Sequence, residues 1–222
     1  MQYHAIATDY DGTLATDGVV DKVTLAALHR YREAGGRLLM VTGRVLADLQ
    51  QAFPEIDIFD GVVVENGAVF FQPATGEIQN LGAPPPEAFV EALVAQQIGP
   101  IHRGHVIVST WQPHGEAVQR TIETMGLEAQ IIMNKRAVMV LPKGVNKATG
   151  LAIAFRQLSL TPERVVGIGD AENDHDLLLG CGLGVAVDNA LPSVKAIAQR
   201  VTTQPRGAGV AELVNLILDG HI

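Results

Sequence analysis

The sequence predicts an α/β protein with a doubly wound parallel (Rossmann-like) sheet as its core and a small α+β cap inserted after the third core strand. Near both ends of the chain, short apolar runs alternate with amphipathic stretches at helical spacing, which is typical of parallel strands joined by helical crossovers. In the middle, helices and closely spaced strands replace this alternation. We therefore expect a core of residues 1–81 and 143–222 and a cap of residues 82–142.

The composition is that of a globular protein with a sizeable core, since 47% of the 222 residues are hydrophobic and 18% are charged. A net charge of -8, with 16 basic residues spread along the chain, argues against nucleic acid or an anionic membrane as a partner. Cys181 is the only cysteine, which excludes an intramolecular disulfide and a multi-cysteine metal site. The sequence shows no basic leader and no apolar run of membrane length, so we expect a cytoplasmic protein; it indicates no oligomeric state.

The first apolar run, residues 3–8, is too short for a helix and is followed by the motif DYDGTL at residues 9–14, so it predicts a buried strand. In an extended backbone, residues two apart point to the same side, which lets Asp9 and Asp11 face one small volume. Two such carboxylates repel unless a cation lies between them or one takes a proton, and a hard ion such as Mg²⁺ prefers oxygen ligands. The alternative is a surface turn, because Asp-Gly pairs are common in hairpins.

The elements that follow can be assigned from hydrophobic spacing and turn signals. A second turn signal at residues 15–20 predicts a small hairpin beside the carboxylates, and an apolar stripe capped by Asp21 predicts a helix. The strand, helix, strand order that results predicts a parallel pair with a right-handed crossover. Up to the third strand we expect helices at residues 22–34 and 45–53 and strands at residues 37–41 and 61–64.

The alternation changes after the third strand. Residues 69–71 and 77–80 predict an antiparallel hairpin, and the Pro-rich residues 83–86 predict a stiff linker. In the insert we expect helices at residues 87–97 and 116–125 and strands at residues 106–110, 129–133 and 137–141. The alternation returns with a helix at residues 147–158, capped by Asn146, a strand at 164–168, a helix at 173–179, a strand at 183–187, a helix at 191–199, a short strand near Val201 and a helix at 210–218.

Polar residues follow several of the predicted core strands. In open α/β sheets ligands bind at the carboxyl ends of the strands, so these residues are expected to meet. They offer acids, a hydroxyl, a glycine amide and cations, which suit the handling of a phosphoryl group. The candidates are Asp9 and Asp11 after the first strand, Thr42, Gly43 and Arg44 after the second, Asp170, Asn173 and Asp174 after the strand at residues 164–168, and Lys147 at the start of the helix that follows the insert.

These four segments resemble, in family order, the four motifs of the haloacid dehalogenase-like (HAD) hydrolase superfamily, and the resemblance extends over the whole chain. The insert lies between the third strand and the lysine segment, which resembles the C2-capped, Cof-type branch of HAD phosphatases, although this insert is small for that branch. The branch includes sucrose-phosphate, mannosyl-phosphoglycerate and archaeal phosphoglycolate phosphatases.

The resemblance implies Asp9 as a nucleophile that becomes an aspartyl phosphate and Asp11 as general acid and base. It implies Thr42 and Lys147 as phosphate ligands, with Lys147 also restraining the charge of Asp9. Lys143 is an alternative for the lysine role, but Lys147 opens its helix as in Cof-type sequences and is preferred. An aspartate at position 11 fits a phosphatase or a phosphomutase, because an ATPase of this superfamily usually has threonine there.

The resemblance also implies a Mg²⁺ ion held by the carboxylate of Asp9, the main-chain carbonyl of Asp11 and the carboxylate of Asp170. Asn173 and Asp174 are expected to support this site from nearby. The expected protein is thus a Mg²⁺-dependent phosphatase of a small phosphorylated metabolite, such as a sugar phosphate or phosphoglycolate. The alternatives are a phosphomutase and a phospho-accepting regulatory or binding protein on the same fold.

In capped members of the superfamily the cap contacts the leaving group, so polar residues near its turns are candidates for substrate selection, although for each one taken alone surface placement is the more common case. Arg44 and the pair Glu65 and Asn66 are further candidates for the cleft, and His175 is at most a neighbour of the metal site. No Gly-x-Gly-x-x-Gly or Walker-type loop supports a nucleotide site. The cap candidates are His102, Arg103, His105, Trp111, His114, Asn134, Lys135 and Arg136.

Overall fold

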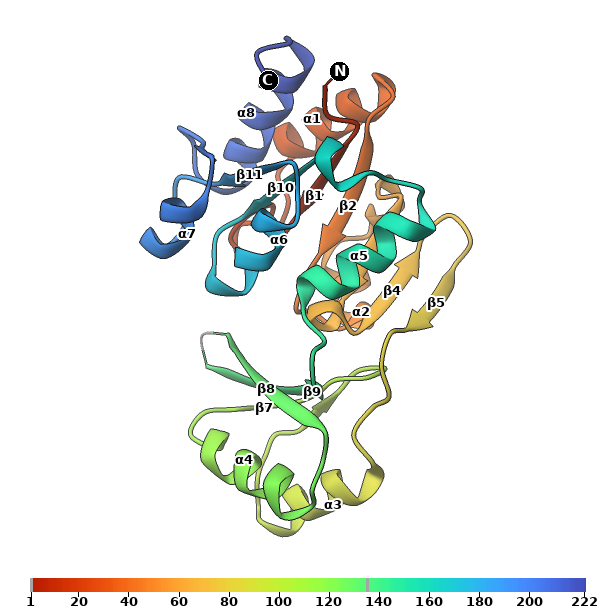
Figure 1. Ribbon diagram of the computed structural model, residues 1–222, viewed down its shortest axis with the longest axis vertical. Coiled ribbons are helices and arrows are strands. Elements are labelled where there is room, and N and C mark those ends of the chain that lie inside the picture. Colours follow the sequence, from red (N-terminus) through yellow and green to blue (C-terminus); the bar gives the residue numbers. More distant parts are fainter. Residues whose placement is uncertain (1, 135) are drawn as a thin grey trace.

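The computed structural model describes residues 2–134 and 136–222 and places them in a large upper core and a smaller cap below it, joined by two linkers (Figure 1). Within these residues the core contains an eight-stranded sheet. Its first six strands in sheet order are parallel to one another, and each of the remaining two runs antiparallel to the strand before it. In order across the sheet they are β12 (Arg200–Val201), β11 (Leu183–Ala186), β10 (Val165–Gly169), β1 (Ala5–Thr8), β2 (Arg37–Val41), β3 (Gly61–Val64), β4 (Val69–Gln72) and β5 (Glu77–Asn80).

Helices cover both faces of this sheet. The first and last helices of the core, α1 and α8, pack against each other on one face, while α5 and α6 pack on the other (Figure 1). The core helices are α1 (Lys22–Glu33), α2 (Leu46–Ala52), α5 (Lys147–Gln157), α6 (His175–Leu179), α7 (Pro192–Ile197) and α8 (Arg206–Leu218), and the short 3₁₀ turns are η1 (Ile56–Ile58), η2 (Glu65–Gly67), η3 (Pro162–Arg164) and η4 (Glu172–Asp174). Among the described residues, no helix is both long enough and apolar enough to span a membrane.

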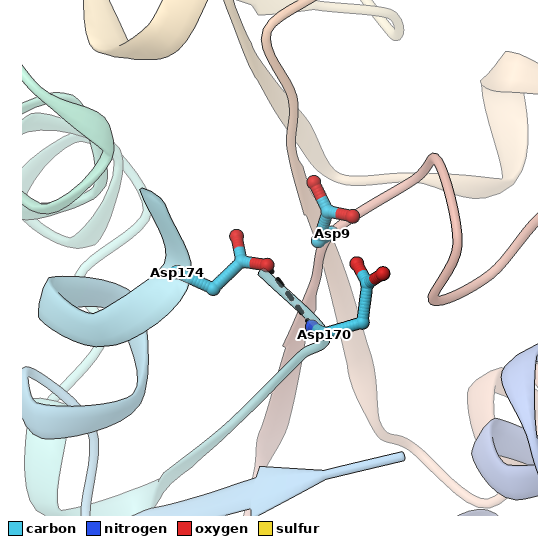
Figure 2. A group of neighbouring side chains, drawn as sticks. All are labelled: Asp9, Asp170 and Asp174. Carbon is cyan, nitrogen blue, oxygen red and sulfur yellow. Dashed lines mark hydrogen bonds between the residues drawn. The ribbon is translucent and has the colours of Figure 1, made fainter. Parts of the chain in front are cut away.

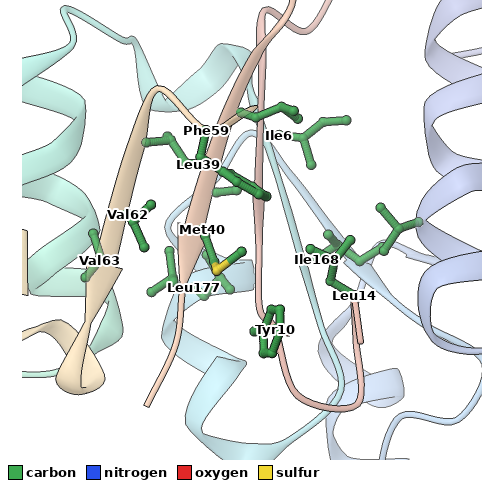
Figure 3. Close-up of a cluster of buried hydrophobic side chains, with 14 of the residues drawn as sticks. Ile6, Tyr10, Leu14, Leu39, Met40, Phe59, Val62, Val63, Ile168 and Leu177 are labelled. Atoms are coloured by element: carbon green, nitrogen blue, oxygen red, sulfur yellow. The ribbon is translucent and has the colours of Figure 1, made fainter. Parts of the chain in front are cut away.

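The central strand β1 shows why the sequence folds this way. All four of its residues are buried, because helices cover it above and below, and its sequence is therefore a continuous apolar run without alternation. Its neighbours β10 and β2 pair with it in parallel, with Ile6 opposite Val166 and Leu38. Figure 3 shows the apolar side chains that pack around these strands, including Ile6, Leu39 and Ile168. Full burial of each such side chain stabilises the fold by about 1.5–3 kcal/mol.

The cap contains an antiparallel sheet with its two helices on the side away from the core (Figure 1). These helices cover a separate small hydrophobic cluster in which Phe89, Leu93, Val118 and Val138 are buried. The opposite face of the cap sheet is turned toward the carboxyl ends of the core strands (Figure 1). In sheet order the strands are β6 (His102–Arg103), β7 (Val108–Trp111), β9 (Ala137–Pro142) and β8 (Ala129–Asn134), and the helices are α3 (Glu87–Ala95) and α4 (Gly115–Thr124).

The predicted fold class is confirmed, and most differences concern the ends of elements. The predicted hairpin of β4 and β5 forms, but as the antiparallel edge of the core sheet. Strand β6 is not predicted, because two exposed residues give no hydrophobic alternation. Helix α8 begins four residues earlier than predicted. The prediction began it too late because the two glycines in its first turn are poor helix formers. The helix predicted at residues 173–179 divides into η4 and α6.

Candidate active site

The carboxyl end of β1 brings Asp9 to the centre of the molecule, next to a buried lysine. Lys147, on the first turn of α5, is only 2% exposed, and its Nζ donates to Asp9 Oδ1 at 2.5 Å and to Asp174 Oδ1 at 2.6 Å. Asn146 holds this turn in place as N-cap, because its side chain accepts from the amide of Thr149 at 2.9 Å. Burial alone would lower the pKa of Lys147, but the charges of Asp174 and Asp9 outweigh it and raise the pKa, so this ammonium stays charged.

The two candidate lysines lie in different surroundings. Lys143 lies on the surface, where its Nζ is 3.7 Å from a carboxylate oxygen of Glu128 and both side chains are mostly exposed. Lys147 is buried between the two acids of the site. Of the two, only Lys147 contacts Asp9.

The loop after β10 supplies two more acids to the same place. The main-chain amides of Asp170 and Ala171 each donate to Asp174 Oδ2 at 3.0 Å, while Asp174 Oδ1 accepts from Lys147. Asp174 therefore orients both this loop and the ammonium of Lys147. Asp170 Oδ1 accepts from the hydroxyl of Thr13 at 3.1 Å. Gly12 has a φ of +95°, and a Cβ there would lie 2.4 Å from Asp170 Oδ2, so a glycine is required for the carboxylate to stand where it does.

The carboxylates of Asp9, Asp170 and Asp174 together fit a hard divalent cation. Figure 2 shows them converging, and each offers an oxygen within 4.8 Å of the other two. The ammonium of Lys147 contacts two of these acids, Asp9 and Asp174, yet burial and the charge of Asp174 still raise the pKa of Asp9. A cation among these oxygens would offset this repulsion, and an all-oxygen donor set is the kind that Mg²⁺ binds.

Asp11, two residues beyond Asp9, is held by an arginine. Arg44 Nε donates to Asp11 Oδ2 at 2.6 Å and Arg44 Nη2 donates to Asp11 Oδ1 at 2.7 Å, which forms a bidentate ion pair. The guanidinium also lies over the ring of Tyr10, 5.0 Å from its centroid. Tyr10 is itself buried in the core, and its hydroxyl donates to the carbonyl of Gly18 in the small hairpin predicted beside the carboxylates. Arg44 therefore occupies both oxygens of Asp11 in this structure.

A cavity of about 360 Å³ lies between these strand ends and the cap sheet. It is at the lower end of the range of about 300–1,000 Å³ that is common for small-molecule sites. The register of the cap strands sets His102 beside Ser109, Ser109 beside Met139 and Trp111 beside Ala137 along the wall opposite Asp9. The cavity is lined by Asp9, Asp11, Thr42, Gly43, Arg44, Val45, Asp48, His102, Ser109, Thr110, Trp111, Ala137, Met139, Asp170, Ala171 and Asn173.

Of the cap candidates, His102 and Trp111 line this cavity, and their rings meet edge to face with centroids 6.4 Å apart. Arg103 instead forms a bidentate surface ion pair with Glu87. His105, His114 and Arg136 are not among the lining residues of the described chain. Lys135 lies outside the described residues, as does the side chain of Asn134. His175 begins α6 and is not part of the lining.

Several residues of this region have little or no signal in the sequence. Asp48, Ser109 and Met139 join the lining through the folding of α2 and the cap sheet, and nothing in their sequence neighbourhood marks them. Thr13 contacts Asp170, and its position inside the motif of residues 9–14 is the one signal that could have indicated a role. Glu65, expected at the cleft, is completely buried and contacts the cap backbone instead.

The chain has relatives among known proteins. The sequence profile of the haloacid dehalogenase-like hydrolases matches residues 6–92 and 115–214. The chain is 31% identical over 219 residues to a phosphoglycolate phosphatase of Methanothermobacter thermautotrophicus, covering 95% of this chain and 96% of that protein.

Solved structures resemble the fold over nearly its full length. A haloacid dehalogenase-like hydrolase from Bacteroides thetaiotaomicron superimposes with a TM-score of 0.83 at 20% identity, covering 97% of this chain and 99% of the other. A sugar phosphatase of HAD subclass IIB superimposes with a TM-score of 0.76 at 20% identity, covering 98% and 99%. Both likenesses concern the core together with the cap.

Proposed function

The chain belongs to the haloacid dehalogenase-like hydrolase family, and on this premise we propose that it is a phosphatase that hydrolyses monoesters of small metabolites through a phosphorylated Asp9. The observation that carries the proposal is the position of Asp9. It ends the central strand at the floor of the cavity, 5% exposed, with its Oδ1 bound to the ammonium of Lys147. A carboxylate in this position can attack a phosphorus atom that enters the cavity.

The remaining residues have roles that follow from their positions. Asp9 attacks phosphorus, the bond to the leaving oxygen breaks, and Asp11, which must first have left Arg44 and taken up a proton, donates that proton to the leaving oxygen. Asp11 then accepts a proton from a water molecule that attacks the phosphorylated Asp9, which releases phosphate and restores the carboxylate. The phosphoryl oxygens would be bound by the hydroxyl of Thr42, the amide of Gly43, the guanidinium of Arg44 and the ammonium of Lys147.

Arg44 must release one of the two Asp11 oxygens before Asp11 can reach a leaving group, because both accept from its guanidinium. An incoming phosphate offers Arg44 an alternative anion of suitable geometry. We therefore expect substrate binding itself to free Asp11 for proton transfer. In the resting protein, the pair keeps Asp11 at the edge of the cavity.

Asp9, the main-chain carbonyl of Asp11 and Asp170 would hold a Mg²⁺ ion, with Asn173 and Asp174 supporting them. When bound, this ion supplies positive charge that neutralises the oxygens of the transferred group. Asp174 is suited to the supporting role, because both its oxygens already accept hydrogen bonds from Lys147 and from the loop after β10.

The size of the cavity limits the substrate. A volume of about 360 Å³ leaves room for a leaving group of a few carbon atoms above the phosphate. Phosphoglycolate, the substrate in the name of the full-length relative, and small sugar phosphates fall into this class. The cap residues His102, Ser109 and Trp111 would contact the leaving group.

The test is phosphate release from a panel of phosphorylated two- to six-carbon metabolites, with Mg²⁺ and with a chelator. We expect metal-dependent release that is confined to a few related compounds and is abolished in Asp9→Asn with the fold retained. Asp57→Asn, a change of the same kind on the surface, should leave the activity unchanged. Release by Asp9→Asn at the wild-type rate would exclude Asp9 as nucleophile.

A further inference from the structure

The cap is attached to the core at a point other than its linkers, and this attachment depends on Glu65. Glu65 is the first residue of η2, after β3, and it is 0% exposed. Its Oε1 accepts from the amide of His105, and its Oε2 accepts from the amides of Val106 and Ile107, all at 2.8 Å. These three amides belong to the turn between β6 and β7, so a single core carboxylate binds a loop of the cap.

The docked loop also places an apolar side chain in the core. Val106 is 0% exposed and belongs to the hydrophobic cluster of the core, whereas Val108, two residues later, belongs to that of the cap. A Cβ on Gly104 would lie 2.3 Å from Glu65 Oε1, so the close approach of loop and carboxylate requires a glycine there. A charged contact and an apolar contact thus fix the same few residues, which we call the docking loop (residues 104–107).

The linkers alone would leave the cap able to turn. They run side by side, since a Cβ on Gly82 of the first linker would lie 2.8 Å from the side chain of Pro142, where the second begins. The side chain of Gln130, in the cap, holds the second linker against the cap by donating to the carbonyls of Pro142 and Val145. Because the two linkers are adjacent, they can act together as one hinge between core and cap. The docking loop adds an independent attachment.

Glu65 connects this attachment to both walls of the cavity. Its own amide donates to the carbonyl of Arg44 at 2.9 Å, and the amide of Asn66 donates to the carbonyl of Thr42 at 3.0 Å. Asn66 Nδ2 lies 3.2 Å from the sulfur of Met139, which lines the cap wall. Glu65 and Asn66 both have left-handed backbones, with φ of +55° and +53°, a conformation that persists in non-glycine residues where surrounding contacts demand it.

We propose that Glu65 is the docking residue of the cap: its carboxylate holds the docking loop on the core and so fixes the distance between the cap wall and Asp9. The cap is then closed in the resting protein, and Glu65 is a positioning residue for the leaving group. The docking itself is independent of the activity proposed above, whereas the effect on the leaving group rests on it.

Amide hydrogen exchange tests the docking directly. In Glu65→Gln the side chain keeps its shape but loses its charge, and its NH₂ group opposes amides that need an acceptor. We expect exchange at residues 105–107 to rise at least about tenfold, with β1 and β10 keeping their protection. Val106→Ala, which leaves the carboxylate in place, should raise exchange at the same residues to a smaller extent. Glu77→Gln, on the exposed edge strand β5, is the matched control and should change none of them.

Unchanged exchange at residues 105–107 in a folded Glu65→Gln would overturn the docking role of Glu65, whatever Val106→Ala shows. Equal loss of protection in β1 and β10 in both variants would also overturn it, because Glu65 would then stabilise the core and not the cap contact. If Glu65→Gln does not fold, the exchange of Val106→Ala decides between these outcomes.

Steady-state kinetics tests the positioning. In Glu65→Gln we expect KM for the best metabolite to rise at least about fivefold, with a smaller change for p-nitrophenyl phosphate, whose leaving group needs little help from the cap. Glu65→Asp keeps the charge and should recover part of the loss. Equal effects on both substrates would refute the positioning role. Wild-type protein without phosphatase activity would refute the proposed function, while the exchange measurement still decides the docking.

Discussion

Replacing Lys147 by methionine should destabilise the protein more strongly than any surface change. The substitution removes the ammonium that contacts Asp9 and Asp174 and leaves two buried carboxylates together, with side-chain exposures of 7% and 0%. Breaking a buried ion pair from one side costs about 3–5 kcal/mol. With an m-value of about 2 kcal/mol/M in urea, the unfolding midpoint should fall by about 1.5–2.5 M. Lys143→Met removes an exposed lysine and should cost at most about 1 kcal/mol.

The loss of stability in Lys147→Met should depend on pH, and the charges around Asp9 determine whether it grows or shrinks as the pH falls. Burial, followed by the charge of Asp174, already raises the pKa of Asp9 against the opposing effect of Lys147, and removing Lys147 raises it further. A raised pKa means that the folded protein binds a proton more tightly than the unfolded chain, so lowering the pH favours the folded variant. Urea titrations of Lys147→Met without Mg²⁺ should therefore show a smaller loss at pH 5 than at pH 8. A loss equal to that of Lys143→Met, or one that grows as the pH falls, would refute the reasoning.

Three further predictions concern single residues. Gly12→Ala places a Cβ 2.4 Å from Asp170 Oδ2, so calorimetry should show Mg²⁺ affinity reduced at least about tenfold; unchanged affinity would remove Asp170 from the metal site. Asp11→Asn should slow the hydrolysis of alkyl phosphates more than that of aryl phosphates, and equal losses would count against its acid role. Asp21→Ala should cost about 1 kcal/mol at pH 7 through loss of the α1 cap. Burial raises the pKa of Asp21, but hydrogen bonds from the first turn of α1 outweigh it and lower the pKa. The stabilisation by the cap should therefore vanish as the pH falls below 3.8 in acid titrations of the wild type and Asp21→Ala. A difference between the two proteins that persists below that pH would contradict the cap assignment.

The sequence contained enough information to bring the strand-end residues together. Asp9, Thr42 and Asp170 each follow a strand of the parallel sheet, and the carboxyl ends of such strands meet at one edge whatever the details of packing. Lys147 could be placed because its helix follows directly on the insert and begins at a recognisable cap.

Contacts that depend on the folding of the cap could not be predicted in the same way. Glu65 binds main-chain amides some forty residues later, and an amide is present at nearly every position, so the partner has no sequence signal. The pairing of Arg44 with Asp11 was not predicted, because only the geometry of the loop after β2 brings the two side chains together. Strand β6 is recognisable only through the partner that it pairs with, β7.

The adjacency of the two linkers at Gly82 and Pro142 has a consequence for how such proteins change over evolutionary time. A chain that leaves the core and re-enters it at one point can lengthen, shorten or exchange the inserted segment without moving either end of the interrupted scaffold. New leaving-group preferences can then arise by replacing one module while the catalytic strand ends stay as they are. Glu65 need not change with the module, because it contacts main-chain amides, which an exchanged segment also provides.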